Sequence, residues 1–234
     1  MSSAQVSRSE ASNGAAAGHP GAGPRGVLMV LTGTVLGVLM LVLGLTVRTS
    51  PVAALDLRID RHIALQDRVG WLTTLATAVS QTATPETVGI GLMTGLPLLL
   101  LLLRRRLDAL RVFCAFGGAF ALAEIGKRLI GEQRPPASLW AMPAGGGASY
   151  PSGHVTTAAV LVIAIVAVSN AAVWRYTAVV LGAGYVLAVA ASRIYLADHY
   201  PPDVIGSVLC ALAAVCVVDG LLALTGLKRR LQPG

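Results

Sequence analysis

The chain has 234 residues, of which 55% are apolar and only 12% are charged, and its mean hydropathy is +0.72. Soluble domains carry roughly twice that charged fraction, so the composition excludes an ordinary soluble domain and indicates an integral membrane protein of one domain. The formal net charge of +7 would suit a nucleic-acid partner. The basic residues, however, lie at the ends of apolar runs, where they set membrane topology, and we expect no nucleic-acid partner.

The first residues divide into a polar part and an apolar part. Residues 1–25 are rich in Ala, Ser, Gly and Pro and have no apolar periodicity, which predicts a disordered tail. Residues 26–47 are uncharged and long enough to cross a bilayer. This run is longer than the apolar core of a signal peptide, so an uncleaved first membrane span is favoured over a cleaved signal.

Residues 48–81 have a different pattern. Leu55, Ile59 and Ile63 recur at four-residue spacing among charged residues, which predicts a helix lying at the membrane interface. The uncharged segment 71–83 that follows is too short to span comfortably. We expect it to dip into the membrane or to pack on the bundle.

Five further apolar runs are each predicted to span the membrane: residues 87–103, 107–130, 154–173, 176–192 and 204–227. The predicted fold class is therefore all-α. We expect a polytopic membrane bundle of six transmembrane helices plus an interfacial helix, which together form one domain over residues 26–230. Cys114, Cys210 and Cys216 lie within apolar runs, without metal-ligand or disulfide spacing, and are expected to be buried structural thiols.

The placement of the basic residues predicts the topology. With six spans, the N-terminal tail, residues 104–106, Arg175 and residues 228–230 share one side of the membrane, and the positive-inside rule makes that side cytoplasmic. Residues 128–153 and 193–202 then face outward together. They would still do so if segment 71–83 also spanned, because only the N-terminal tail would change sides. We expect a plasma-membrane protein whose functional site faces away from the cytoplasm.

Three groups of polar residues fall at this outer surface although they are far apart in sequence. They are Lys127, Arg134 and Pro135; Ser152, Gly153 and His154; and Ser192, Arg193, His199 and Asp203. Charged groups near membrane depth are costly and mark functional sites. Snorkelling toward lipid headgroups would explain a lone arginine, but it does not explain the histidines. Lys127 and Arg134 would share one side of the third span if its helix continued through Gly131.

His199 is followed by Tyr200, Pro201, Pro202 and Asp203. Prolines suit the first positions of a helix, so Asp203 falls in the first turn of the sixth span and its carboxylate can reach back to the His199 ring. A carboxylate that holds one ring nitrogen leaves the other as a nucleophile or base. The alternative is an interfacial histidine with no catalytic role, which the neighbouring Asp203 and Arg193 disfavour.

The turn over residues 150–154 places a hydroxyl, an unhindered backbone N–H and an imidazole at the start of the fourth span. Helix N-termini of this kind bind phosphate. His154 could merely cap the helix. Because it follows Ser152 and Gly153 directly, we interpret it as a proton donor.

The remaining polar residues receive structural interpretations. Glu124 lies four residues before Arg128, the favourable order for a helical ion pair. Asp198 would point away from the site on an extended backbone, so we expect it to be exposed to solvent. Asp219, inside the sixth span, is expected to pair with a basic residue. Two histidines outside the clusters are given no role: His19 and His62.

Together, these motifs resemble those of the type 2 phosphatidic acid phosphatase (PAP2) superfamily, in its membrane lipid phosphatase branch. Lys127-x6-Arg134-Pro135 is similar to the first motif, Pro151-Ser152-Gly153-His154 to the second, and Ser192-Arg193-x5-His199-x3-Asp203 to the third. Each motif alone is a modest signal, whereas all three occur in the family's order and spacing relative to the spans. The resemblance covers roughly residues 87–227.

The resemblance implies metal-independent phosphoryl transfer. His199 would attack phosphorus and form a phosphohistidine, Asp203 would orient it, and His154 would protonate the leaving oxygen and then activate water. The phosphate oxygens would be bound by Lys127, Arg134, Ser152, the Gly153 N–H and Arg193. We expect neither a metal nor another cofactor, since cations replace magnesium here and no carboxylate cluster suited to magnesium accompanies the motifs.

We therefore expect an integral membrane enzyme that hydrolyses a lipid phosphate or diphosphate, of the phosphatidic acid or polyprenyl diphosphate type. A lipid phosphotransferase with the same site is one alternative. A non-enzymatic transporter is another, although transporter sites tend to lie near the membrane midplane. The sequence carries no signal for the lipid headgroup or for the oligomeric state.

Overall fold

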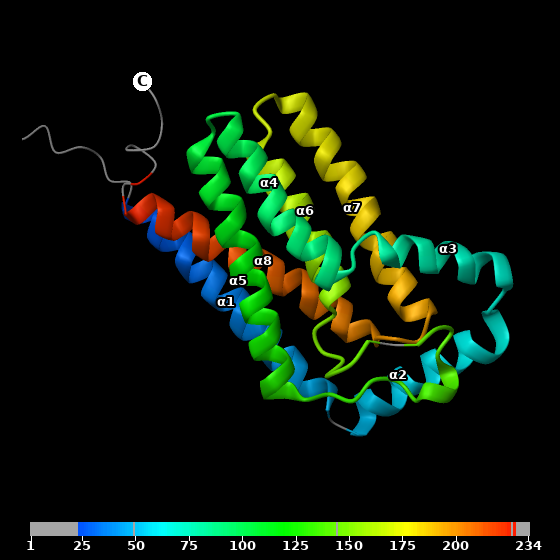
Figure 1. The fold of residues 1–234 in the computed structure, drawn as a ribbon. Helices are drawn as coiled ribbons and strands as arrows, with labels where there is room; N and C mark the ends of the chain where they lie inside the picture. Colours follow the sequence, from blue (N-terminus) through cyan, green and yellow to red (C-terminus); the bar gives the residue numbers. More distant parts are fainter. Residues whose placement is uncertain (1–22, 49, 144, 226, 228–234) are drawn as a thin grey trace, which may run out of the picture.

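A computed structural model describes residues 23–48, 50–143, 145–225 and 227. Their regular structure is entirely helical, which confirms the predicted all-α class (Figure 1). The longer helices are α1 (Gly23–Val47), α2 (Ser50–His62), α3 (Gly70–Gln81), α4 (Ile90–Leu102), α5 (Arg106–Ile130), α6 (Gly153–Val168), α7 (Ala172–Tyr195) and α8 (Pro201–Leu224). The short turns are η1 (Ile63–Asp67), η2 (Pro85–Gly89) and η3 (Ala137–Leu139). Of the predicted tail, residues 1–22 lie outside the described residues.

The helices confirm a polytopic membrane bundle, and six spans is an approximate count. Within the described residues, five helical stretches are long and apolar enough to cross a bilayer: Gly23–Val47, Gly70–Leu102, Arg106–Ile130, Ala172–Tyr195 and Pro201–Leu224. The predicted fourth span is shorter, since α6 has 16 residues and ends at Val168. The reason is local. Ser169 donates from its hydroxyl to Ile165 O (2.7 Å) and takes an extended conformation, as a serine at a helix end can do.

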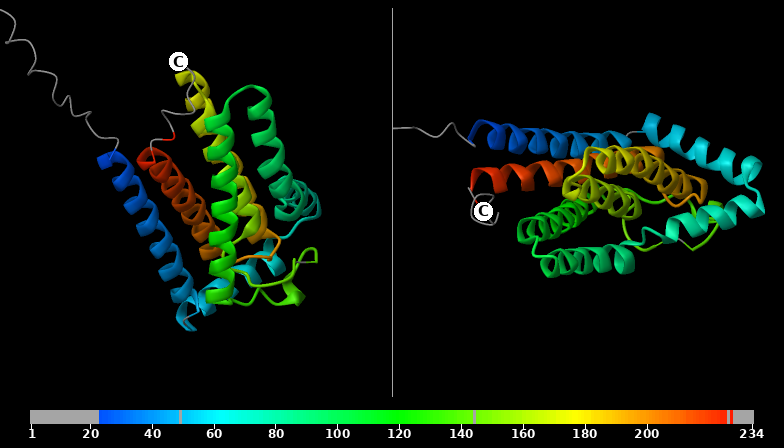
Figure 2. Two further views of the ribbon diagram at one scale, coloured as in Figure 1. Left: turned by 60° about the vertical axis from the view of Figure 1, so that its left-hand side comes forward. Right: turned by 90° about the horizontal axis from the view of Figure 1, so that it is seen from above.

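α1 and α8 lie side by side in all views (Figures 1 and 2) and run antiparallel, with Gly26 near Leu224 and Gly33 near Ala213. α5 and α6 pack against α8, α4 packs against α5, and α7 packs against α6. The main core lies where α4, α5, α6 and α8 meet, and is filled by residues such as Phe116, Val160 and Ala211. This packing fixes where the first turns of α6 and α8 lie, and both carry residues of the predicted site.

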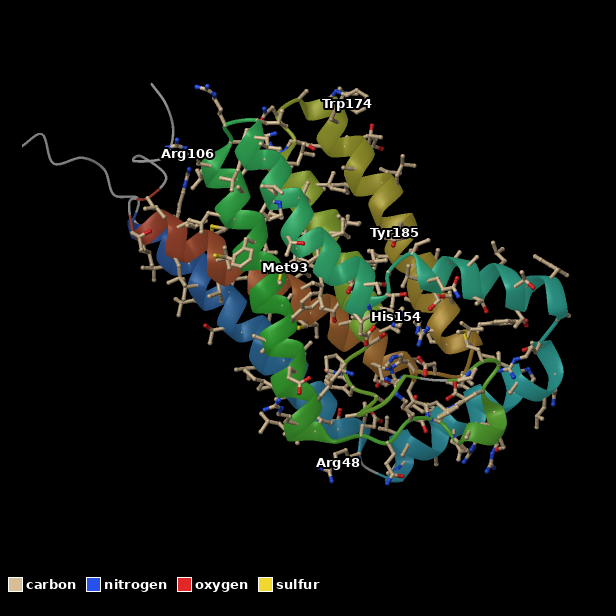
Figure 3. The ribbon with its side chains drawn as sticks, in the orientation of Figure 1. Arg48, Met93, Arg106, His154, Trp174 and Tyr185 are labelled. Atoms are coloured by element: carbon tan, nitrogen blue, oxygen red, sulfur yellow. The ribbon has the colours of Figure 1, made fainter. Side chains whose placement is uncertain are left out.

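The predicted interfacial segment becomes α2, η1 and α3, which run across one end of the bundle (Figure 1). α3 packs against α7, as expected for segment 71–83. The turn before α3 is tied to the end of α7: Arg68 Nη2 donates to Leu139 O (2.8 Å) and to Tyr195 O (3.3 Å). This end of the molecule also holds Arg48, while Arg106 and Trp174 lie at the other end (Figure 3).

The ion pairs predicted from sequence are present. Arg128 Nε donates to Glu124 Oε1 at 2.8 Å on the exposed side of α5. Asp219 forms a two-pronged ion pair with Arg111, so it does pair with a basic residue, from α5. The cysteine prediction is correct in part. All three thiols are unpaired, and Cys210 is buried, but two are only half-buried: Cys114 and Cys216.

The close contact of α1 with α8 depends on the missing side chain of Gly33. A Cβ at this position would lie 2.7 Å from Ala213 O and 2.9 Å from Val217 N, so the two backbones would have to separate. Gly95 on α4 provides a matched position, because a Cβ there would meet nothing within 4 Å.

We predict that Gly33→Ala destabilises the protein by about 1–3 kcal/mol, the usual cost of overpacking. The measurement is the midpoint of thermal unfolding in detergent. Gly95→Ala should leave this midpoint unchanged or raise it, since alanine favours a helix. Equal midpoints for the two variants would mean that close approach at Gly33 is not required.

Candidate active site

One cavity of about 700 Å³ brings the three polar groups together. Six of the eight predicted site residues line it: Lys127, Arg134, Gly153, His154, Arg193 and His199. The other two, Ser152 and Asp203, are fully buried next to lining residues. His154 lies at the end of α6 away from Trp174 (Figure 3). Residues separated by whole helices in the sequence therefore share one pocket.

Asp203 holds the His199 ring. The prolines at the start of α8 put Asp203 in the first helical turn, where Oδ2 accepts a hydrogen bond from Tyr200 N (3.0 Å) and lies 3.1 Å from His199 Nδ1. Ser149 Oγ also donates to this oxygen, at 2.5 Å. Since a carboxylate only accepts hydrogen bonds, the ring proton belongs on Nδ1 and the lone pair on Nε2. Nε2 lies 3.2 Å from the Arg134 guanidinium, a donor.

The His199 ring is neutral at ordinary pH. It is 1% exposed, and burial lowers its pKa to about 4, although the Asp203 carboxylate opposes this shift. The nearby positive charges of Arg134 and Arg193 lower the pKa further. A neutral imidazole whose Nε2 carries the lone pair is the form that can attack an electrophile, once the contact from Arg134 is given up to the substrate.

Four basic residues line the cavity, and the three that belong to the predicted motifs come from different elements. Lys127, in the last turn of α5, donates from Nζ to Ala148 O (2.9 Å). Arg134, in the loop after α5, donates from Nε to Gly147 O (3.3 Å). Arg193, near the end of α7, donates from Nη1 to Ser80 Oγ on α3. Because lysine and arginine have several donors each, the remaining N–H groups are free to bind an anion.

Lys127 and Arg134 reach the same cavity by a different route from the one predicted. The helix does not continue through Gly131: this residue ends α5 in the left-handed conformation (φ 60°, ψ 32°), and its N–H bonds Lys127 O at 2.9 Å. Such a helix end favours glycine, which has no Cβ to clash. The chain then turns back, and the following loop carries Arg134 to the pocket.

The start of α6 is tied to the start of α8. Ser207 Oγ donates to Ser152 O at 2.9 Å, and Ser152 N lies 3.4 Å from Asp203 O. Ser152 is the N-cap residue, and its own hydroxyl is fully buried with no hydrogen-bond partner among the described residues. Gly153 follows at the cavity wall, where a Cβ would lie 2.8 Å from Pro85 Cγ. An N-terminal turn with a free hydroxyl suits an anion.

The expectation for Asp198 is wrong. Asp198 is 2% exposed, and its carboxylate pairs with Arg134 and Arg193. The backbone here is turned rather than extended: Ala197 has a φ of 54°, and the N–H groups of residues 198 and 199 both point back to Arg193 O. This tight turn directs Asp198 inward together with His199.

Four contributors were missed by sequence reasoning: Ser80, Glu132, Ser149 and Asp198. The serines gave no signal, because nothing in the sequence shows which distant backbone they approach. Glu132 lies between two residues of the first motif and is 9% exposed. Burial and then the Asp203 charge raise the pKa of Glu132 well above its usual range, so its protonated carboxyl can donate a hydrogen bond to Asp203. The signal available in the sequence was that Glu132 is a charged residue inside the first motif.

The site is a pocket lined by basic residues and two imidazoles, set in a membrane bundle. Basic side chains around a cavity suit the binding of a phosphate group. The family model described as the PAP2 superfamily matches residues 108–221, the part of the chain that carries all three motifs. The predicted resemblance is therefore confirmed. No curated protein sequence matches the chain.

Two solved structures are similar to this one. A transmembrane PAP2-type phosphatidylglycerolphosphate phosphatase from Bacillus subtilis superposes with a TM-score of 0.70 at 21% identity, over 86% of this chain and 98% of that one. LpxE from Aquifex aeolicus gives a TM-score of 0.53 at 19% identity, over 73% of this chain and 95% of that one. At these identities the likeness establishes the fold, a PAP2-type membrane helix bundle.

The pocket predicts that a cation lining it and a cation outside it affect anion binding differently. Lys127→Met should weaken orthovanadate binding about tenfold to a hundredfold, the effect of losing one charge-assisted hydrogen bond. Arg175→Met should change it less than twofold, because Arg175 is exposed at the start of α7 and does not line the cavity. Calorimetric titration of the purified protein in detergent measures both values. Equal affinities for the two variants would remove Lys127 from the anion site.

Proposed function

We propose that this protein is an integral membrane lipid phosphatase that hydrolyses a lipid phosphate or diphosphate at the extracytoplasmic face, through a phosphohistidine intermediate. The match to the PAP2 superfamily model and the apolar helices support the membrane lipid phosphatase. One observation carries the mechanism: His199 has Nδ1 bound to Asp203 and Nε2 beside Arg134, in a cavity that it shares with His154.

In the first step, the Nε2 lone pair of His199 attacks phosphorus in line with the leaving oxygen. The N–P bond forms, the P–O bond to the lipid breaks, and His154 gives its proton to the departing oxygen. The arriving phosphate brings negative charge beside His154, which favours the protonated form needed for this step. Asp203 stabilises the positive charge that develops on the His199 ring.

In the second step, His154 takes a proton from water, and the water oxygen attacks phosphorus. The P–N bond breaks, inorganic phosphate leaves, and His199 regains its lone pair. Charge spreads over the equatorial oxygens in both transition states. In this proposal that charge is met by the phosphate-binding groups: Lys127, Arg134, Ser152, the Gly153 N–H and Arg193. Preorganised donors of this kind are the largest source of rate enhancement in many enzymes.

The cavity wall supports a lipid substrate. Beside the polar residues it includes Pro85 from η2 and two residues of α5, Phe120 and Ala123. These residues provide an apolar surface for the part of the lipid next to its phosphate. Phosphatidic acid and polyprenyl diphosphates remain the leading candidates, and the Bacillus subtilis neighbour adds phosphatidylglycerol phosphate to the test panel.

The side of the membrane follows from charge. His154 lies away from Arg106 and Trp174, which mark the other end of the bundle (Figure 3). The arginine-rich turn at residues 104–106 belongs at the cytoplasmic side by the positive-inside rule. This supports an active site at the extracytoplasmic face of the plasma membrane, in a domain spanning residues 26–230.

The direct test is phosphate release by purified protein from a panel of lipid phosphates and diphosphates in detergent, with EDTA present. We expect release from at least one lipid, and a loss of a thousandfold or more in His199→Ala and in His154→Ala. His62→Ala is the matched control, because His62 is exposed and lies outside the pocket. Unchanged release in either active-site variant would contradict the mechanism. Product analysis with an added acceptor alcohol separates hydrolysis from phosphotransfer.

The pH profile tests the state of the nucleophile. Burial lowers the His199 pKa to about 4, so the Nε2 lone pair is available above this pH and is lost only as pH falls through it. The pH dependence of kcat/KM reports the pKa values of groups in the free enzyme. We therefore expect no fall in kcat/KM near pH 6.5 from protonation of His199. The profile is corrected for ionisation of the substrate phosphate. A fall in kcat/KM near pH 6.5 caused by protonation of His199 would show that this ring is solvated like an ordinary histidine.

A further inference from the structure

Asp198 lies between the two arginines of the phosphate site. Its Oδ1 accepts from Arg134 Nη1 at 2.8 Å, and its backbone O accepts from the same nitrogen at 3.0 Å. Its Oδ2 pairs with Arg193 Nη2. The arginines come from different elements, the loop after α5 and the last turn of α7. One side chain therefore links two parts of the bundle at the pocket.

This carboxylate also fixes the distance between a guanidinium and the nucleophile. Arg134 Nη1, which bonds Asp198, is 3.2 Å from His199 Nε2. Asp198 Oδ2 is itself 3.6 Å from Nε2. A bare carboxylate so close to the attacking nitrogen would repel a phosphate, but here both of its oxygens face guanidinium groups. Its effect on a bound phosphate is therefore exerted through Arg134 and Arg193.

Burial makes the Asp198 carboxylate important for the arrangement of its arginine partners. Arg193 is 4% exposed and Asp198 is 2% exposed, so neither charge has water as an alternative partner. Two neighbouring guanidinium groups, one buried and one partly buried, would repel each other and separate without a carboxylate between them. With the carboxylate in place, some N–H groups of each arginine are used, and the others are directed to the cavity.

We propose that Asp198 is a positioning residue of the phosphate site, which holds Arg134 and Arg193 at the spacing that the phosphoryl transition state requires. The proposal rests on the proposed phosphatase function and deepens it. Asp198 does not touch the substrate. It determines where two of the three cations place their donors relative to His199 Nε2.

A positioning role and a purely structural role predict changes in different binding affinities. Asp198→Asn removes the negative charge and leaves the cavity more positive, so inorganic phosphate should bind within threefold of wild type or more tightly. The arginines lose their fixed spacing, so orthovanadate, which imitates the five-coordinate transition state, should bind about tenfold to a hundredfold more weakly. We expect kcat for the best lipid substrate to fall by a similar factor.

The experiment combines calorimetric titration of phosphate and orthovanadate with kcat and KM in detergent. Asp108→Asn is the matched control, because Asp108 pairs with Arg105 in the first turn of α5, outside the pocket, and this variant should keep kcat within twofold. Asp198→Glu is the second variant. It keeps the charge but moves it by one methylene, so it should retain phosphate affinity and lie between wild type and Asp198→Asn in kcat.

Three results would overturn the proposal: an Asp198→Asn variant with kcat within threefold of wild type, equal weakening of phosphate and orthovanadate, or a kcat for Asp198→Glu no higher than that of Asp198→Asn. If Asp198→Asn does not fold, the glutamate variant decides alone, since an orthovanadate affinity equal to wild type would exclude positioning. A wild-type protein that releases no phosphate from any lipid contradicts the proposed function instead. In that case, the affinities of the Asp198 variants for phosphate and for orthovanadate would still test how Asp198 arranges the anion site.

Discussion

The hydrogen bond between His199 Nδ1 and Asp203 Oδ2 is the contact on which the rest of the site depends. It sets the ring tautomer, leaves the lone pair on Nε2, and provides a counter-charge for the ring. The carboxylate is itself held by Tyr200 N–H and Ser149 Oγ, with Glu132 nearby. A fully buried carboxylate is stable only with several such partners. The loops around the pocket supply them.

Bundle packing brings the two histidines to one pocket. His199 is fixed by the first turn of α8, and His154 lies in the first turn of α6. The hydrogen bond from Ser207 Oγ, in the second turn of α8, to Ser152 O, at the N-cap of α6, joins the starts of the two helices. The close packing of α1 on α8, permitted by Gly33, holds α8 in place from the other side. Helix packing far from the pocket therefore determines how the two histidines face each other.

The sequence predicted those parts of the site that depend on local rules. Two prolines before Asp203 marked the start of α8, and this alone placed the carboxylate beside His199. The Glu124–Arg128 pair followed from helical spacing. The all-α membrane class followed from apolar runs, although α6 ended earlier than its apolar run because Ser169 leaves the helix.

Contacts between distant segments could not be predicted in the same way. Ser80 reaches Arg193 only because α3 packs on α7, and no local pattern encodes that meeting. Asp198 was placed wrongly because an extended backbone was assumed, whereas Ala197 turns the chain in the left-handed region. Gly131 likewise ended α5 where a continuous helix was expected. In each case a single backbone conformation decided which way a charged side chain points.

An experimental structure with orthovanadate bound tests the central claim most directly. We expect one vanadium atom bonded to His199 Nε2, with His154 at the opposite apical oxygen and the equatorial oxygens contacting Lys127, Arg134 and Arg193. Vanadate bound without His199, or with the two imidazoles on the same side of the metal, would contradict in-line transfer through a phosphohistidine.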